Sequence, residues 1–359
     1  MLVLLGSASV LGAILLAAAD AAGHQIDFDI YRMGAGQVMG PHLYDVRLSR
    51  SLMGGRRGMQ FTYPPFAALL FWPFTQLSVP AAQLAWSVLN TGALLGLIGL
   101  SLSAARPHWP ARQTWSLAAC ALLPALRLNP NGLTLGLGQV NFFIALLVLA
   151  DLTGGLKLRG RTLPRGLLVG IAAAIKLTPL IFIPFLVLTR QLRAAVTASV
   201  TFLICSLGMF AVASQSSRRY WTTEIFDDKR SGNLLHISDQ NLHSALQRVL
   251  GHAPGPLLAG TLTILLACAG LAVATWAHRA SSPLLGLLAC AATGLIVSPV
   301  SWIHHYVWVV PALAWLAFAT DRPRGGRWWA LGLAVLLWAA PPWWVPDQQQ
   351  GYGDLAVLL

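Results

Sequence analysis

Runs of about 20 predominantly apolar residues recur along this sequence from Leu2 nearly to its C-terminal end. An α-helix needs about that length to cross a bilayer, and the sequence lacks the alternating segments of about ten residues that indicate a membrane β-barrel. Hydrophobic residues make up 56% of the chain and charged residues 10%, against roughly 25% charged in a soluble domain. The sequence therefore predicts an all-α, polytopic membrane protein that forms one domain, residues 1–359.

The net charge of +12 is spread over short connectors between the apolar runs. Lys and Arg are retained on the cytoplasmic side of short loops, so this distribution indicates membrane orientation and argues against nucleic-acid binding. The basic connectors expected in the cytoplasm are 106–112, 157–165, 190–193, 278–280 and 321–327. Two long segments that carry acidic residues should then face outward. They are residues 20–80, with a juxtamembrane helix at 64–77, and residues 214–255.

Charge parity predicts about eleven spans, of which the first, Leu2 to Ala19, lacks the basic start of a signal peptide. Two half-depth helices, 166–176 and 179–189, should meet at the sequence KLTP, because a broken helix is tolerated where it lines a cavity. The other spans are expected at 81–103, 114–128, 135–152, 194–213, 256–277, 283–297, 303–320 and 328–344. The terminal YGDLAVLL resembles the start of a further span and suggests a truncated C-terminus. The four cysteines lie inside apolar runs and indicate neither disulfide nor metal.

This topology gathers the unusual polar residues on the outer side of the membrane. Asp27 and Asp29 follow the first span, Lys176 lies at the half-helix break, and a histidine pair lies in SPVSWIHHY (298–306). Ionisable residues at membrane depth are functional candidates by default. Solvated loop acids, a lysine that reaches the interface and interfacial histidines are the structural alternatives. Their clustering on one side favours chemistry at the outer membrane surface.

Five segments, taken in order, resemble glycosyltransferase family 87: DFDIYRMGAGQVMGPHLYD, FTYPPFAALLFWPF, LGQVNFFIALLVLADL, GIAAAIKLTPLIFIPFL and VSPVSWIHHYVWVVPAL. Within that family the chain resembles the actinobacterial polyprenyl-phosphate-mannose-dependent α-1,2-mannosyltransferases of phosphatidylinositol mannoside synthesis. The resemblance implies a GT-C fold with about 11–12 transmembrane helices and an inverting transfer of mannose to a glycolipid. Related enzymes carry the catalytic base just after the first span in a D-x-x-x-Y setting, which falls here on Asp27 and Tyr31.

On this hypothesis Asp27 removes the proton from the acceptor hydroxyl. Lys176 and Arg32 bind the donor phosphate and stabilise the charge that develops on it, and His304 and His305 are further catalytic candidates. The candidate substrate-binding residues are Asp29, Tyr31, Tyr63, Gln139, Asn141, Gln240, Asn241, His243, Ser301 and Trp302.

No cofactor is expected, although the resemblance leaves open a divalent cation held by Asp27 and Asp29. The expected partners are a polyprenyl-phosphate-sugar donor, a phosphatidylinositol mannoside or related glycolipid acceptor, and the bilayer. The protein is expected as a monomer in the plasma membrane, with its active site on the extracytoplasmic side. Two alternatives remain: an arabinofuranosyltransferase that uses polyprenyl-phosphate-arabinose, and a lipid-linked sugar transporter or flippase. A transporter should show two related halves, which this sequence lacks.

Overall fold

The computed structural model describes residues 2–21, 25–48, 59–154, 157–158, 160–227, 230 and 236–340. Most of them form helices, and the strands of this described part are β1 (Lys157–Leu158) and β2 (Arg161–Thr162), which pair antiparallel. The α-helices are α1 (Leu2–Ala21), α2 (Ile26–Ala35), α3 (Pro65–Phe71), α4 (Val79–Ala105), α5 (Ala111–Leu126), α6 (Asn129–Gly136), α7 (Asn141–Thr153), α8 (Leu167–Ile175), α9 (Phe182–Leu188), α10 (Leu192–Val212), α11 (Ser214–Thr222), α12 (Leu242–Leu250), α13 (Pro256–Arg279), α14 (Pro283–Val297), α15 (Val309–Phe318) and α16 (Gly326–Ala339). The 3₁₀ helices are η1 (Trp72–Gln76), η2 (Thr178–Ile181), η3 (Glu224–Phe226) and η5 (Ile303–Trp308).

Within the described residues, the three helices α4, α10 and α13 are each long and apolar enough to cross a bilayer. The most apolar stretch of α13 is only 6% buried inside the protein, which is expected of a helix that faces lipid. The prediction of an all-α membrane protein is confirmed. The count of about eleven spans, the single domain with its two outer loops and the GT-C arrangement stay predictions.

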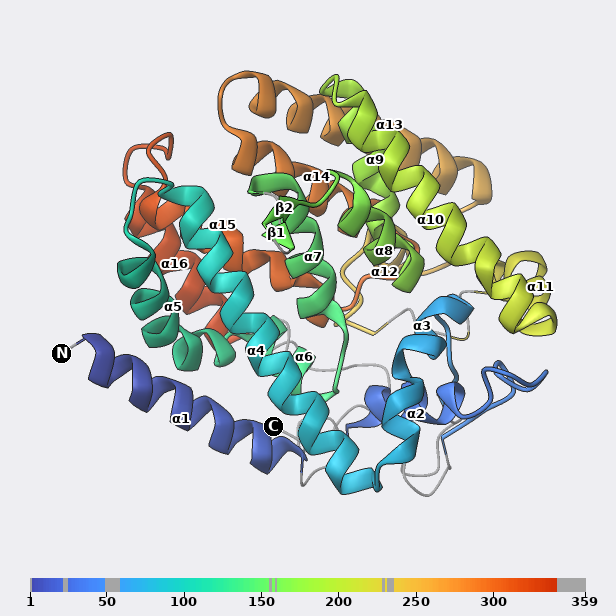
Figure 1. Ribbon diagram of the computed structural model, residues 1–359. Coiled ribbons are helices and arrows are strands. Elements are labelled where there is room, and N and C mark those ends of the chain that lie inside the picture. The colour runs from blue at the N-terminus through green and yellow to red at the C-terminus, as the bar shows by residue number, and fades with distance from the viewer. Residues whose placement is uncertain are drawn as a thin grey trace.

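The helices pack as a bundle around α4, which contacts α1, α5, α7 and α15. Figure 1 shows α1 along one edge of this bundle, and α2 and α3 grouped at one end. Elsewhere α10 packs against α8 and α9, and α13 packs against α14. Helix α6 contacts η5, so two segments about 170 residues apart in the chain meet beside α7.

The segment 135–152, predicted as one continuous span, is interrupted by a turn, and its helical part α7 begins only at Asn141. Between α6 and α7 the chain bends by 117° across the residues LGQV. Gly138 has a φ of +72°, a conformation that residues with a Cβ rarely adopt. The carbonyl oxygens released by the turn are bonded from outside: Leu137 O accepts from the backbone N–H of Asp27 at 3.0 Å, and Gly138 O accepts from Trp86 Nε1 at 2.7 Å.

Other interruptions were predicted correctly. The chain breaks at KLTP, where α8 ends before Lys176 and η2 begins at Thr178, and the segment 64–77 forms the short helices α3 and η1. The span expected at 303–320 begins with the 3₁₀ helix η5, which has a non-helical residue at Tyr306, and continues as α15. Helix α16 ends at Ala339, so residues 341–344 of the last predicted span and the terminal YGDLAVLL lie outside the described residues.

Asp151, near the end of α7, caps the next helix. Its carboxylate accepts hydrogen bonds from the backbone N–H groups of Gly166 at 2.9 Å and Val169 at 2.9 Å, which satisfies donors at the start of α8. Gly166 has a φ of +97°, and a Cβ there would lie 2.0 Å from the carbonyl oxygen of Ala194 on α10. Close packing of α8 on α10 therefore depends on this glycine.

Replacing Gly166 by alanine should destabilise the protein by roughly 2 to 4 kcal/mol, from left-handed backbone strain together with overpacking. Gly160→Ala is the matched control, because Gly160 has a φ of +81° but a Cβ there would meet no atom of the described residues within 4 Å. Thermal unfolding of both purified variants in detergent measures the difference. Equal losses of Tm would show that the contact with Ala194 is not the cause.

Candidate active site

Helix α2 carries the candidate base. Its first turn is docked on the α6–α7 break, where Leu137 O accepts the backbone N–H of Asp27. Asp27 and Tyr31 lie four residues apart and therefore on one face of the helix. Both side chains are buried, with exposed fractions of 6% and 4%. The D-x-x-x-Y pattern thus directs a carboxylate and a phenol to the same place.

The other charged residues of α2 point elsewhere. Asp29 lies about 200° around the helix from Asp27 and accepts a hydrogen bond from Gln83 Nε2 of α4 at 2.9 Å. Arg32 donates to the carbonyl oxygens of Phe74 at 3.1 Å and Leu77 at 2.7 Å, so its guanidinium holds the end of η1. The two carboxylates therefore do not converge on one point, and Arg32 does not join the polar cluster around Asp27.

Gln139 connects Asp27 to two tyrosines. Its Nε2 donates to Asp27 Oδ2 at 2.6 Å, while its Oε1 lies 2.8 Å from the hydroxyl of Tyr31 and 3.1 Å from that of Tyr63. The two hydroxyls are 3.0 Å apart. These residues come from α2, from the segment before α3 and from the α6–α7 break, so the cluster exists only in the folded chain.

The environment of Asp27 changes its acidity. Burial raises the pKa of this carboxyl to about 6, because the charged form loses its hydration. The hydrogen bond from Gln139 and the positive charge of Lys176 both act in the opposite direction, lowering the pKa. A carboxyl with a pKa near the working pH is suited to general-base catalysis.

Lys176 lies at the break between α8 and η2 and is 8% exposed. Its Nζ is 3.0 Å from Asn141 Oδ1 and 2.9 Å from His305 Nε2, and it lies 5.3 Å from the centre of the Tyr63 ring. Tyr63 thus touches both the carboxylate network and the ammonium group. The alternative explanation required the lysine to extend to the membrane interface. Its burial beside Asn141 and His305 shows that it does not.

His304 and His305 are both buried, each with an exposed fraction of 8%, and their rings are in contact. The carbonyl oxygen of His304 accepts hydrogen bonds from Thr134 Oγ1 and Asn141 Nδ2, each at 2.8 Å. Nε2 of His304 has no hydrogen-bond partner among the described residues. Asn141 therefore holds the histidine segment with one end of its amide and Lys176 with the other.

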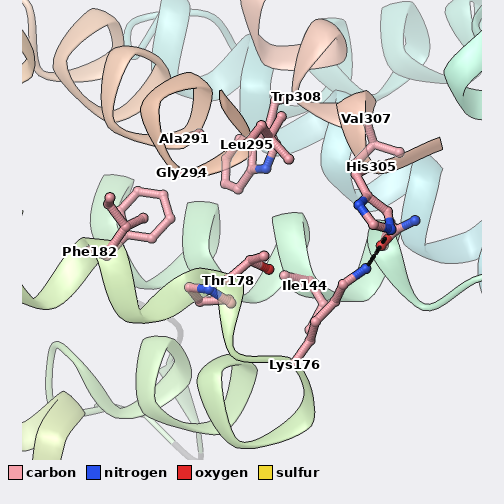
Figure 2. A pocket seen from close by; sticks show the side chains of 13 residues that line it. Ile144, Lys176, Thr178, Phe182, Ala291, Gly294, Leu295, His305, Val307 and Trp308 are labelled. Carbon is pink, nitrogen blue, oxygen red and sulfur yellow. Dashed lines mark hydrogen bonds between the residues drawn. The ribbon is translucent and has the colours of Figure 1, made fainter. Parts of the chain in front are cut away.

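A narrow pocket with a volume of ≈ 30 Å³ leads away from this polar cluster. Figure 2 shows Lys176 and His305 approaching each other at one end of it. The rest of the lining is mostly apolar and comes from η2, α9, α14 and η5, with Phe182, Leu295 and Trp308 among its residues. A charged group at one end and an apolar lining beyond it suit a ligand with a polar head and a hydrocarbon tail.

The second long loop is joined to the histidine segment by backbone pairing. Asp239 and Trp302 form an antiparallel bridge, and the N–H of Gln240 donates to Ser301 O at 2.8 Å. The carboxylate of Asp239, fully buried, accepts from the N–H of Ser301 at 2.8 Å and from the amide of Asn241 at 3.0 Å. These contacts fix the course of the chain immediately before the histidines.

Several candidate substrate-binding residues therefore hold the loop in place. The side chain of Asn241, 1% exposed, caps α12 by accepting the N–H of Ser244 at 2.7 Å and also donates to Pro299 O at 2.7 Å. Gln240 donates to the carbonyl of Ile237. His243 is half-buried on α12, and within the described chain no hydrogen bond links it to the cluster around Lys176. The prediction that these residues bind substrate stays a prediction.

The sequence indicated Asp239 only as part of the second long loop, the expected acceptor side, and it did not single out Thr134. Asp239 begins the pattern DQNLHS, in which an Asn precedes an amphipathic helical turn. This pattern is a helix-start signal, so a helix cap next to Asp239 could have been predicted from the sequence. Thr134 lies in the apolar stretch LTLGLG and carried no local signal, because its role depends on the distant carbonyl of His304.

Known proteins similar to this chain share one enzymatic description. Residues 61–299 match the model of glycosyltransferase family 87. A protein of Mycolicibacterium smegmatis, named polyprenol-phosphate-mannose-dependent α-(1-2)-phosphatidylinositol mannoside mannosyltransferase, is 34% identical over 92% of this chain and 79% of its own length. A protein of Mycobacterium tuberculosis with the same name is 35% identical over 84% and 72%. Another M. tuberculosis protein is named polyprenol-phosphate-mannose-dependent α-(1-2)-phosphatidylinositol pentamannoside mannosyltransferase. It is 35% identical over 79% of this chain and 65% of its own length. No solved structure gave a significant match.

Proposed function

This chain belongs to glycosyltransferase family 87, and we propose that it transfers mannose from polyprenyl-phosphate-mannose to a phosphatidylinositol mannoside in α-1,2 linkage. The relatives' names supply the donor and the acceptor. The observation in the structure that carries the proposal is the burial of a carboxylate and an ammonium group in one cluster, bridged by Gln139 and Tyr63. Transfer from a phosphate leaving group requires a base that takes the proton of the acceptor hydroxyl and a positive charge that stabilises the leaving phosphate.

The reaction follows from these two groups. The acceptor hydroxyl attacks the anomeric carbon of mannose, its proton passes to the carboxylate of Asp27, and the bond from that carbon to the phosphate oxygen breaks. The polyprenyl phosphate leaves with the bonding electrons, and the ammonium group of Lys176 stabilises its charge. His305, in contact with Lys176, orients the ammonium group or donates to the phosphate. One displacement inverts the anomeric configuration, so a β-linked donor yields an α-mannoside.

The pocket beyond Lys176 is the site where we propose that the first isoprene units of the donor bind. Its apolar lining from α9 and α14 matches a hydrocarbon chain, and at ≈ 30 Å³ it must widen to admit one. The acceptor would approach from the side of α2 and the second loop. We place this site on the extracytoplasmic face of the plasma membrane, since the basic connectors mark the opposite side as cytoplasmic.

Lys176 already supplies positive charge at the phosphate, and α2 turns Asp27 and Asp29 to different sides. On that ground we propose that transfer needs no divalent cation. The rate of transfer should therefore be the same with and without a chelator.

Purified protein in lipid nanodiscs should move radiolabelled mannose from polyprenyl-phosphate-mannose to a phosphatidylinositol mannoside, and α-mannosidase should release the label. Polyprenyl-phosphate-arabinose should give no product. Transfer of arabinose in place of mannose would establish the arabinofuranosyltransferase alternative. Inactivity with both donors, together with movement of the labelled lipid between leaflets, would establish a flippase.

A further inference from the structure

The backbone around Gln139 is held by three separate elements. The N–H of Gln139 donates to Thr134 O of α6 at 2.8 Å. The carbonyl oxygen of Gly138 accepts from Trp86 Nε1 of α4, and that of Leu137 accepts from the N–H of Asp27 in α2. A Cβ at Gly138 would lie 2.6 Å from the Cβ of Phe28, so the break and α2 are in close contact. The Gln139 side chain therefore starts from a fixed point beside Asp27.

The orientation of the Gln139 amide is also determined. Its Oε1 receives the hydroxyls of Tyr31 and Tyr63, and burial raises the pKa of Tyr31 well above its usual range, so this phenol keeps its proton. Rotating the amide by half a turn would place its oxygen against the carboxylate of Asp27, two acceptors in contact. The N–H of the amide must therefore face Asp27 Oδ2.

We propose that Gln139 is a positioning residue for the transfer: its amide holds Oδ2 of Asp27, so that Oδ1 is the oxygen presented to the acceptor hydroxyl. No described residue donates a hydrogen bond to Oδ1. The two tyrosines hold the amide, and the amide holds the base. This inference rests on the proposed function, in which Asp27 is that base, and it gives Gln139 a role other than contact with substrate.

Among the described residues, Gln139 donates a hydrogen bond to Asp27. Tyr31, Tyr63 and Lys176 interact with it electrostatically. A hydrogen bond to the charged form of a carboxyl lowers its pKa, so removal of the amide should raise the pKa of Asp27 above about 6. The expected rise is about 0.5 to 1 pH unit, the equivalent of one net hydrogen bond. Transfer is lost as the pH falls through this pKa, because only the unprotonated carboxylate accepts a proton.

The test is the single-turnover rate of mannose transfer against pH. Wild type should lose activity on the acid side with a midpoint near pH 6. Gln139→Met, which keeps the volume but has no amide, should move this midpoint upward by about 0.5 to 1 unit. Its rate on the plateau should fall about 10- to 100-fold through lost orientation, with little change in donor KM.

Two further variants keep the proposal falsifiable if Gln139→Met does not fold. Gln139→Glu keeps the shape and should raise the midpoint further, because two carboxyls then share the site. Tyr63→Phe leaves the amide N–H on Asp27 and should shift the midpoint by less than half as much.

Each outcome has one meaning. A raised donor or acceptor KM with an unmoved midpoint would overturn the positioning role and return Gln139 to substrate binding. An equal fall of rate at every pH would also overturn it, as mere structural damage. Wild-type protein without mannosyl transfer would overturn the proposed function, a result that is distinct from either of these.

Discussion

Asp27→Asn should lower the rate of mannosyl transfer by about 10²- to 10⁴-fold, the usual contribution of a general base. The asparagine fills the same space and can keep a hydrogen bond with Gln139, but it cannot take the proton from the acceptor hydroxyl. The donor should still bind, because Lys176 and the apolar pocket are unchanged. Single-turnover transfer measures the rate, and binding of labelled donor to the purified variant measures the second expectation.

Asp45→Asn is the matched control for this experiment. Asp45 follows α2 in the chain but is exposed, and its carboxylate pairs with Arg219 at 2.7 Å, so transfer should keep the wild-type rate. Asp29→Asn separates the two acids of α2. If Asp29→Asn is inactive while Asp27→Asn retains transfer, the base is the carboxylate that faces Gln83 and the assignment of Asp27 is wrong.

Lys176→Met should lower the rate by about 10²- to 10³-fold, the range found when one preorganised donor to a developing negative charge is removed. Methionine occupies a similar volume but brings no charge to the leaving phosphate. Lys176→Arg should restore little of the transfer rate that Lys176→Met loses. The planar guanidinium does not fit where a compact ammonium contacts Asn141 and His305. The polyprenyl phosphate product should also inhibit the Met variant less strongly than wild type.

Arg193→Met is the control for lost positive charge, since Arg193 lies exposed at the start of α10 and should leave both rate and inhibition unchanged. The role given to Lys176 would fail if Lys176→Met kept the wild-type rate, or if it lost activity while polyprenyl phosphate inhibited it as before. In the second case the lysine would hold the histidine segment, with no direct action on phosphate.

Helix positions were largely predictable because the signals are local. The structure has α13 at Pro256–Arg279 where an apolar run predicted a span at 256–277, and it breaks the chain at the predicted KLTP. Apolar length and proline act within a few residues, so no tertiary information is needed to place them. The bend at Gly138 escaped prediction because single glycines spaced along an apolar run are tolerated in a continuous helix. Its positive φ is stabilised by α2, which lies more than a hundred residues earlier.

The candidate site shows the same division between residue type and position. Lys176 was selected because a charged group is costly at membrane depth, and Asp27 because the D-x-x-x-Y resemblance falls on it. Arg32 was selected as a second positive charge for the donor phosphate, yet its guanidinium holds the end of η1. Which face of a short helix meets the cluster depends on packing, and the sequence around Arg32 contains no trace of it.

The sequence by itself determined that this chain is a helical membrane protein of family 87 and which few ionisable residues its interior has to accommodate, since hydrophobic length and residue type are properties of the chain alone. Only the tertiary structure decided that Gln139 faces Asp27, that Tyr63 touches both the carboxylate network and Lys176, and that Asp239 ties the second loop to the histidines. Each of these contacts joins segments more than fifty residues apart. Their geometry follows from helix packing and backbone bends, which no local pattern encodes.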